Sequence, residues 1–147
     1  MADRVVIVRI GTHLVSVPFG QIDEILGTDR INSIEDLPEG VVQEGSSSQA
    51  SSRHWVYSRG TWLPVKALIP GTGVSSSSQI VVARWEGTGK AFVVDQVLGI
   101  ETPGKTAPFP ERARPFTDIP IAGIHFWKKG IVLELDLSRL ISLDLGN

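Results

Sequence analysis

The amino-acid sequence predicts an all-β fold, and two observations lead to this class. Apolar residues at helical spacing are almost absent, while runs rich in β-branched residues, bounded by glycine, proline and serine, recur along the whole chain. Glycine also stands at short joins between such runs, at 11–12 and 86–89, where tight turns need positive φ. The 147 residues, 41% of them hydrophobic, are enough for one domain or two small subdomains with a real core.

The strands are expected, in chain order, at 4–10, 13–19, 54–59, 61–68, 79–85, 90–101 and 130–141. The last segment, "GIVLELDLSRLI", is the clearest, because Ile131, Leu133, Leu135 and Leu137 alternate with more polar neighbours. We therefore expect that strand to bury one face.

A weak internal repeat divides the chain into two halves. "RGTWLPVKALI" and "KGIVLELDLSRLI" place Gly60 and Gly130, 130 − 60 = 70 residues apart, at the same point before a leucine and an aliphatic residue. We expect two β-subdomains, approximately 4–73 and 79–143, with exchange of strands between them open. The serine-rich stretches 44–52 and 74–78 are expected to be flexible loops.

Composition excludes several classes of protein. The net charge of -2 comes from 14 basic and 16 acidic residues that are mixed along the chain, so no basic stripe indicates nucleic acid. There is no cysteine, which fits a reducing cytoplasm. No apolar run is long enough for a signal peptide core or for a membrane-spanning helix. The sequence therefore predicts a cytoplasmic protein that does not insert into the membrane.

Signatures of catalysis and of cofactor sites are missing. The three histidines are far apart and form no metal-binding spacing, no serine lies in a nucleophile elbow, and "GTGK" at 87–90 lacks the phosphate-loop pattern. Asp95 interrupts an apolar run, and bonding to nearby backbone amides explains it better than a role as a base. We expect no cofactor and no metal. The alternative from another class is a small β-barrel enzyme or ligand binder that uses Asp95, His125 and Arg59 around a pocket.

Arg59 and Gly60 interrupt the apolar stretch "VYSRGTWLPVKAL". Alternation in the following strand places Leu63 and Val65 on one face and Trp62 on the other. We prefer the hypothesis that the Trp62 side chain points outward, although the alternation of residues alone also allows a buried Trp62.

Four segments, taken together, resemble the CheW-like family, the adaptor domain of bacterial chemotaxis signalling arrays. They are "HLVSVPFGQIDEIL", "SRGTWLPVKAL", "IVVARWEGTGKAFVVDQVLGI" and "IAGIHFWKKGIVLELDLSRLI", which follow one another over nearly the whole chain. Arg59-Gly60 with Leu63-Pro64-Val65 is similar to the Arg-Gly hairpin and Pro-Val strand of the family. Val94-Asp95-Gln96-Val97 resembles its Val-Asp-x-Val strand, and the closing segment resembles its last strand and short helix.

The resemblance implies one CheW-like domain over 1–147, made of two intertwined SH3-like β-barrels of about five strands each and a short C-terminal helix. It also implies no enzymatic activity, and two partners: the helical tip of a chemoreceptor and the regulatory domain of a histidine kinase. The receptor would lie in the groove between the barrels, where Arg59, Gly60, Trp62, Asp95 and Val97 are the candidate residues. The kinase would pack on the first subdomain, where Ile22, Ile25 and Leu26 are the candidates.

Two roles are open for Arg59 in this scheme. Its side chain either reaches the groove, where it holds the barrels in register or contacts a receptor carboxylate, or merely caps the hairpin.

The chain departs from the family pattern in three places. Tyr57-Ser58 stands where an Asn-Leu pair is usual, Lys66-Ala67 where an aspartate is common, and 27–53 replaces a compact segment beside the expected kinase surface. A family member that binds receptor without docking the kinase, and modulates array assembly, is therefore a second hypothesis. In either case the chain is expected in the cytoplasm, in association with receptor arrays at the inner membrane.

Overall fold

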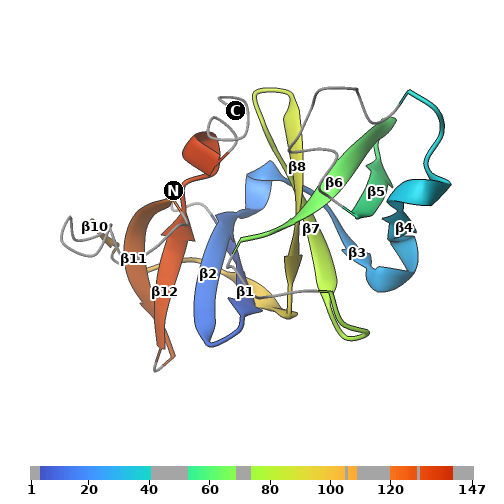
Figure 1. Cartoon of the computed structure of the whole chain (residues 1–147). Helices are drawn as coiled ribbons and strands as arrows, with labels where there is room; N and C mark the ends of the chain where they lie inside the picture. The colour runs from blue at the N-terminus through green and yellow to red at the C-terminus, as the bar shows by residue number, and fades with distance from the viewer. Residues whose placement is uncertain are drawn as a thin grey trace.

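The computed structural model describes residues 4–40, 53–68, 74–104, 106–108, 120–128 and 130–140, and strands make up most of them. Figure 1 shows these strands in two sheets that stand side by side. One short helix, over residues 137–140, follows the last strand. The prediction of an all-β fold with a short C-terminal helix is confirmed.

The first sheet has the strand order β10-β11-β12-β2-β1-β9. Its strands are β1 (Val5–Ile10), β2 (His13–Pro18), β9 (Gln96–Glu101), β10 (Ala107–Pro108), β11 (Ile121–Trp127) and β12 (Gly130–Leu135). Neighbouring strands are antiparallel except for β12 and β2, which run parallel. The β1–β2 join is the tight turn predicted at 11–12, with Gly11 at φ 61°.

The second sheet has the strand order β3-β7-β8-β6-β5-β4. Its strands are β3 (Ile22–Gly27), β4 (Asn32–Ser33), β5 (His54–Ser58), β6 (Thr61–Ala67), β7 (Gln79–Trp85) and β8 (Thr88–Val94), and three 3-10 turns, η1 (Phe19–Gln21), η2 (Thr28–Arg30) and η3 (Ile34–Asp36), flank β3 and β4. Only β6 and β8 are parallel. Because β4 and β10 are two residues long, each sheet keeps five longer strands, the number that the resemblance implies for each barrel.

The chain exchanges strands between its two halves. It leaves the first sheet after β2, builds the second sheet from β3 to β8, and returns to the first sheet with β9. Each sheet therefore combines strands from both predicted subdomains. Of the two serine-rich stretches, 44–52 lies outside the described residues. The other, 74–78, contains a turn in which Ser78 is buried and its backbone N–H donates to the Ser75 carbonyl at 3.1 Å.

Two predicted strands end differently in the structure, and two of the longer strands were not predicted. The segment 90–101 is two strands, because the chain bends at Asp95 and passes from one sheet to the other. The segment 130–141 ends as a strand at Leu135, and Leu137 belongs to the helix that the Asp136 carboxylate caps at the Arg139 N–H, 3.2 Å away. β3 and β11 were not predicted as strands, and both lie next to long strands that were.

The hydrophobic core has three parts. The largest is shared by the two sheets, since Val6 and Val15 of the first sheet and Val81 and Phe92 of the second belong to one cluster. A second cluster lies within the second sheet and a third, around Ile7, within the first. In β7, alternate residues serve the shared cluster and the second sheet's own cluster, which explains why 80–83 is a continuous apolar run.

Candidate functional site

An apolar groove lies where the two sheets meet. It is formed mainly by β3 of the second sheet and β9 of the first, which are the outer strands of their respective sheets. Its volume is about 610 Å³, and it is lined by Val6, Phe19, Ile22, Asp23, Glu24, Ile25, Val97, Leu98, Gly99 and Ile100. A groove of this size and composition is able to hold an apolar segment of a partner.

Large apolar side chains are exposed along this groove. The exposed fractions of Phe19, Ile25 and Ile100 are 39%, 39% and 49%. The guanidinium of Arg4 stands over the Phe19 ring, 4.8 Å from its centroid. Exposed apolar side chains gathered in one concave surface are typical of a site that a partner covers.

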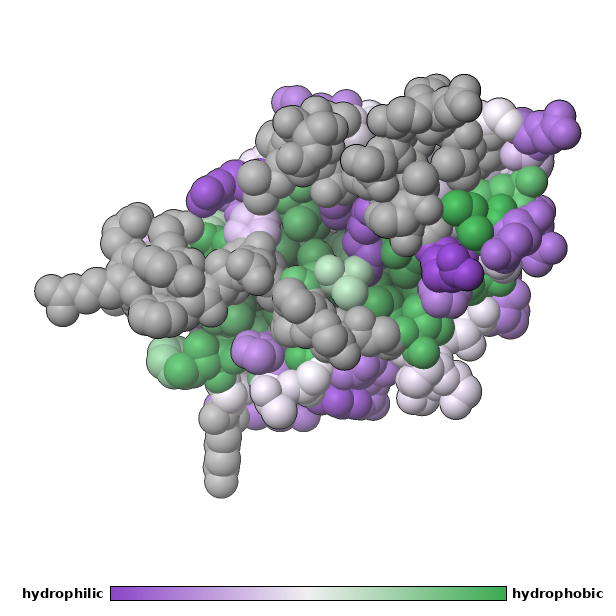
Figure 2. Space-filling model, viewed as in Figure 1, coloured by the Kyte–Doolittle hydropathy of each residue, from purple (hydrophilic) through white to green (hydrophobic). Residues whose placement is uncertain are grey.

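A separate pair of exposed apolar side chains lies on the β11–β12 hairpin. Phe126 and Ile131 face each other across the hairpin and are 70% and 55% exposed. In Figure 2, hydrophobic side chains are visible over the lower ends of these two strands. The pair lines neither the groove nor any other described cavity.

Two acidic residues of β3 join the groove to the β5–β6 hairpin. The Asp23 carboxylate accepts a hydrogen bond from the Arg84 Nε and forms an ion pair with the Arg59 Nε at 3.7 Å. The Glu24 carboxylate accepts a hydrogen bond of 2.6 Å from the Ser58 hydroxyl. Since β3 and β5 are far apart in the strand order, these bonds show that the second sheet curls until β5 meets β3.

Arg59 and Gly60 form the turn of that hairpin. Ser58 pairs with Thr61, and the two residues between them have φ of 49° and 81°, the combination that a type I′ turn requires. The expectation that Gly60 permits a tight turn is met. The Arg59 side chain, 61% exposed, reaches Asp23 of the same sheet, so it lies at the rim of the groove and contacts one sheet.

After the turn, Leu63 points into the core and Trp62 points away from it, as the preferred hypothesis predicted. Leu63 is buried in the core of the second sheet, whereas Trp62 is half-buried and packs against exposed Tyr57 with ring centroids 5.1 Å apart. Trp62 does not line the groove.

Asp95 braces the point where the chain crosses between the sheets. Its carboxylate accepts a hydrogen bond of 2.6 Å from the Gly11 N–H and forms an ion pair with Arg9 at 3.5 Å. Its own N–H donates to the Arg9 carbonyl at 2.9 Å. Val97, two residues later, is fixed by its N–H, which donates to the Gln79 side chain at 2.9 Å.

The structure regroups the predicted site residues. Val97 from the receptor set and Ile22 and Ile25 from the kinase set line one groove. Leu26 is buried in the second sheet's own cluster, and Asp95 lies at the β1–β2 turn. Phe19, Leu98 and Ile100 were not predicted, and their only signal in the sequence is that they flank Ile22 and Val97.

The three residues of the enzyme alternative do not converge. Asp95 contacts Gly11 and Arg9, Arg59 contacts Asp23, and His125 is buried beside Glu134. In the described parts of the chain, no group of three or more histidine, aspartate or glutamate side chains is placed to hold a metal ion. Nor do those parts contain a helix of the length and hydrophobicity that crossing a membrane requires.

Comparison with known proteins points to one family. A family model described as a CheW-like domain matches residues 4–144. The crystal structure of the scaffolding protein TtCheW from Thermoanaerobacter tengcongensis superposes with a TM-score of 0.67 at 19% sequence identity, over 92% of this chain and 90% of that one. No curated protein gives a significant match. The structural likeness, at this identity, concerns the fold.

Proposed function

The chain belongs to the CheW-like domain family, and from this premise we propose that it is a non-enzymatic adaptor that couples a chemoreceptor to a histidine kinase in a bacterial chemosensory or motility pathway. The observation that carries the proposal is the apolar groove between β3 and β9. In this scheme the chain works in the cytoplasm, at receptor arrays on the inner membrane.

The groove suits the helical tip of a receptor. An amphipathic helix binds a groove by laying its apolar face against apolar side chains, at positions three and four residues apart. Phe19 and Ile25 on one side and Ile100 on the other supply such a surface, and they are already exposed. Binding there buries apolar area that the free protein leaves in contact with water.

The kinase needs a different surface if both partners bind at once. Ile22 and Ile25, predicted for the kinase, lie in the same groove as Val97, and Leu26 is buried. We therefore assign Ile22 and Ile25 to the receptor. The regulatory domain of the kinase would then dock elsewhere on the second sheet.

A calorimetric titration tests the receptor assignment. Ile25→Asp places a charge in the groove at an exposed position, so the protein should still fold while its affinity for a receptor-tip fragment falls at least tenfold, about 1.4 kcal/mol. Ile131→Asp, an exposed isoleucine on β12 away from the groove, is the matched control and should bind within twofold of wild type. Equal affinity for the two variants would refute the groove assignment.

The same titration examines Arg59 and the kinase. A folded Arg59→Ala variant that binds receptor as tightly as wild type would exclude a contact between Arg59 and the receptor.

Addition of the kinase regulatory domain to the receptor complex should give a ternary complex. Competition would mean that both partners use the groove, and receptor binding without kinase binding would favour the second hypothesis, an adaptor that has lost kinase docking.

A further inference from the structure

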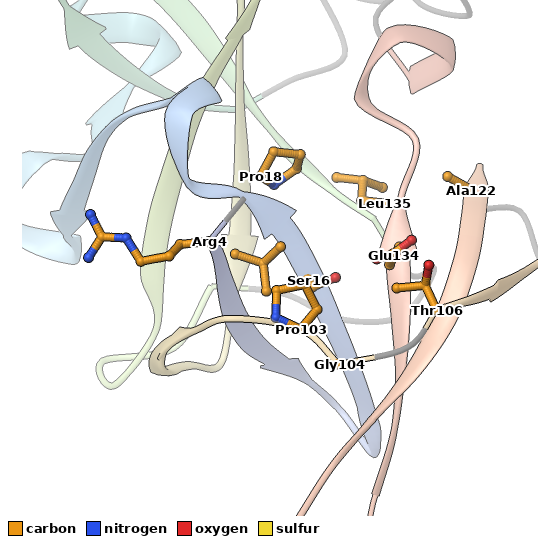
Figure 3. Close-up of a pocket in the computed structure, with 10 residues that line it drawn as sticks. Arg4, Ser16, Pro18, Pro103, Gly104, Thr106, Ala122, Glu134 and Leu135 are labelled. Atoms are coloured by element: carbon orange, nitrogen blue, oxygen red, sulfur yellow. The ribbon is translucent and has the colours of Figure 1, made fainter. Parts of the chain in front are cut away.

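A pocket in the first sheet has no role in the proposed adaptor function. Its volume is about 380 Å³, and residues of β1, β2, β11 and β12 line it together with Pro103, Gly104 and Thr106. It shares no lining residue with the groove. Figure 3 shows Pro18, Pro103 and Ser16 on one side of it and Glu134 and Thr106 on the other.

Oxygen atoms gather on one side of this pocket. Figure 3 shows the hydroxyls of Ser16 and Thr106 near the carboxylate of Glu134, while Arg4 points away. The Ser16 side chain is buried, and its hydroxyl has no hydrogen-bond partner among the described residues. Buried hydroxyls nearly always have a partner, so a ligand or water is expected beside it.

The Glu134 carboxylate occupies space that is free because residue 123 is a glycine. Gly123 pairs with Glu134 across the β11–β12 hairpin, and a Cβ at position 123 would stand 2.9 Å from the Glu134 Oε2 and from the Ala107 carbonyl oxygen. A side chain at 123 would therefore displace the carboxylate or the β10 backbone. Glycine keeps this space open.

Within the described residues, the Glu134 carboxylate has a single ion-pair partner, His125. The Glu134 side chain is only 25% exposed, and its Oε1 lies 3.5 Å from the Nδ1 of His125. His125 is itself buried, and neither of its ring nitrogens has a hydrogen-bond partner within the described part of the chain. A partly buried carboxylate has four lone-pair positions on its two oxygens, so Glu134 is able to accept further hydrogen bonds from a ligand in the pocket.

We propose that this pocket binds the ammonium group of a small primary amine. An ammonium has three donors and no acceptor, which matches one carboxylate and two hydroxyl oxygens. The apolar walls, Val5, Pro18 and Pro103, would cover a short aliphatic body. A single carboxylate supplies too few oxygens for calcium, and an anion would be repelled by Glu134.

A nuclear magnetic resonance titration of the full chain tests the site, with ethylammonium chloride as the probe at constant ionic strength. Backbone signals of Ser16, Thr106, Gly123 and Glu134 should shift and saturate in the millimolar range. Ethanol, the neutral analogue, and sodium chloride should give no saturable shift. Glu134→Gln should weaken binding at least tenfold, whereas Glu86→Gln, an exposed acid in the β7–β8 turn, should leave it unchanged.

Three results would overturn the proposal: no saturable shift with ethylammonium, equal shifts with ethanol, or unchanged affinity in a folded Glu134→Gln variant. If that variant does not fold, Thr106→Val takes its place, because Thr106 is exposed and loses only a hydroxyl. Unchanged affinity in Thr106→Val would then count against the site. None of these outcomes depends on receptor or kinase binding.

Discussion

At the scale of single residues, Asp95 shows how one side chain fixes the path of the chain. It stands between β8 of the second sheet and β9 of the first, and it bonds to the turn of the β1–β2 hairpin. A carboxylate that accepts from a backbone N–H makes a stronger bond than a neutral acceptor does. The crossing between the sheets and the first hairpin are therefore tied at one point.

We expect Asp95→Ala to lower the free energy of unfolding by about 1–2 kcal/mol, because the Gly11 N–H loses a charged acceptor. Asp95→Asn, which still offers an oxygen, should lose less. Urea denaturation measures both variants. Arg9→Gln is the control for the ion pair and should change stability little, since the Arg9 side chain is 43% exposed and the ion pair is therefore screened by water. Equal losses in the alanine and asparagine variants would show that the hydrogen bond to Gly11 is not the source of the stability.

At the scale of elements, the contact between β5 and β3 closes the second sheet. The buried Ser58 hydroxyl and the Glu24 carboxylate make this contact at a sequence distance of 34 residues. The Ser33 hydroxyl bonds to the Glu35 carboxylate in the same chemical way, but both residues lie close together in an exposed turn. That hydrogen bond is the largest cause, and a second one donated by the Glu35 backbone N–H the next, by which the pKa of the Glu35 carboxyl lies below its ordinary value of 4.5.

A double-mutant cycle on Ser58→Ala and Glu24→Gln should give a coupling free energy of about 1 kcal/mol, because the hydrogen bond is partly buried and joins two strands. The matched cycle on Ser33→Ala and Glu35→Gln should give a much smaller coupling, since its partners are exposed. Thermal denaturation at pH 7 provides both values. Similar couplings in the two cycles would contradict a closing role for Ser58 and Glu24.

Local patterns predicted the elements that are buried on both faces. β7 and β8 are examples, since their apolar runs are continuous. In β12, alternation found the strand but not its buried face, because Ile131 is 55% exposed and Val132 is buried. β3 was missed because Asp23 and Glu24 interrupt its apolar residues, and β11 because Gly123 and His125 break its alternation. In the site, Ile22, Ile25 and Val97 were candidates that the resemblance to the CheW-like family implied, the first two for the kinase and Val97 for the receptor. Their meeting in one groove was not predicted, because it depends on how the outer strands of two sheets come together, which no local pattern contains.

At the scale of the whole molecule, the two sheets share one hydrophobic core, and we expect them to unfold as one cooperative unit. Phe92 of β8 packs in the same cluster as Val6 and Val15 of the first sheet. The loss of this side chain would leave a cavity that borders both sheets. Neither sheet is therefore expected to unfold alone.

Phe92→Ala should lower the free energy of unfolding by about 3–5 kcal/mol and leave a single calorimetric transition at a lower temperature. Phe126→Ala is the control, because Phe126 is largely exposed, and its effect should stay within about 0.5 kcal/mol. Two separated transitions in Phe92→Ala would show that the sheets are independent.

The strand exchange also determines the order in which the two sheets can be completed during synthesis. All six strands of the second sheet are contiguous in the chain between Ile22 and Val94, whereas β1 and β2 pair with strands that come after Asp95. During synthesis the first hairpin emerges early, and an isolated two-stranded hairpin is only marginally stable in water. Its valines and isoleucines therefore lack the strands β9 and β12 until after the second sheet has been made, so the first sheet is completed after the second although its first hairpin precedes it in the chain.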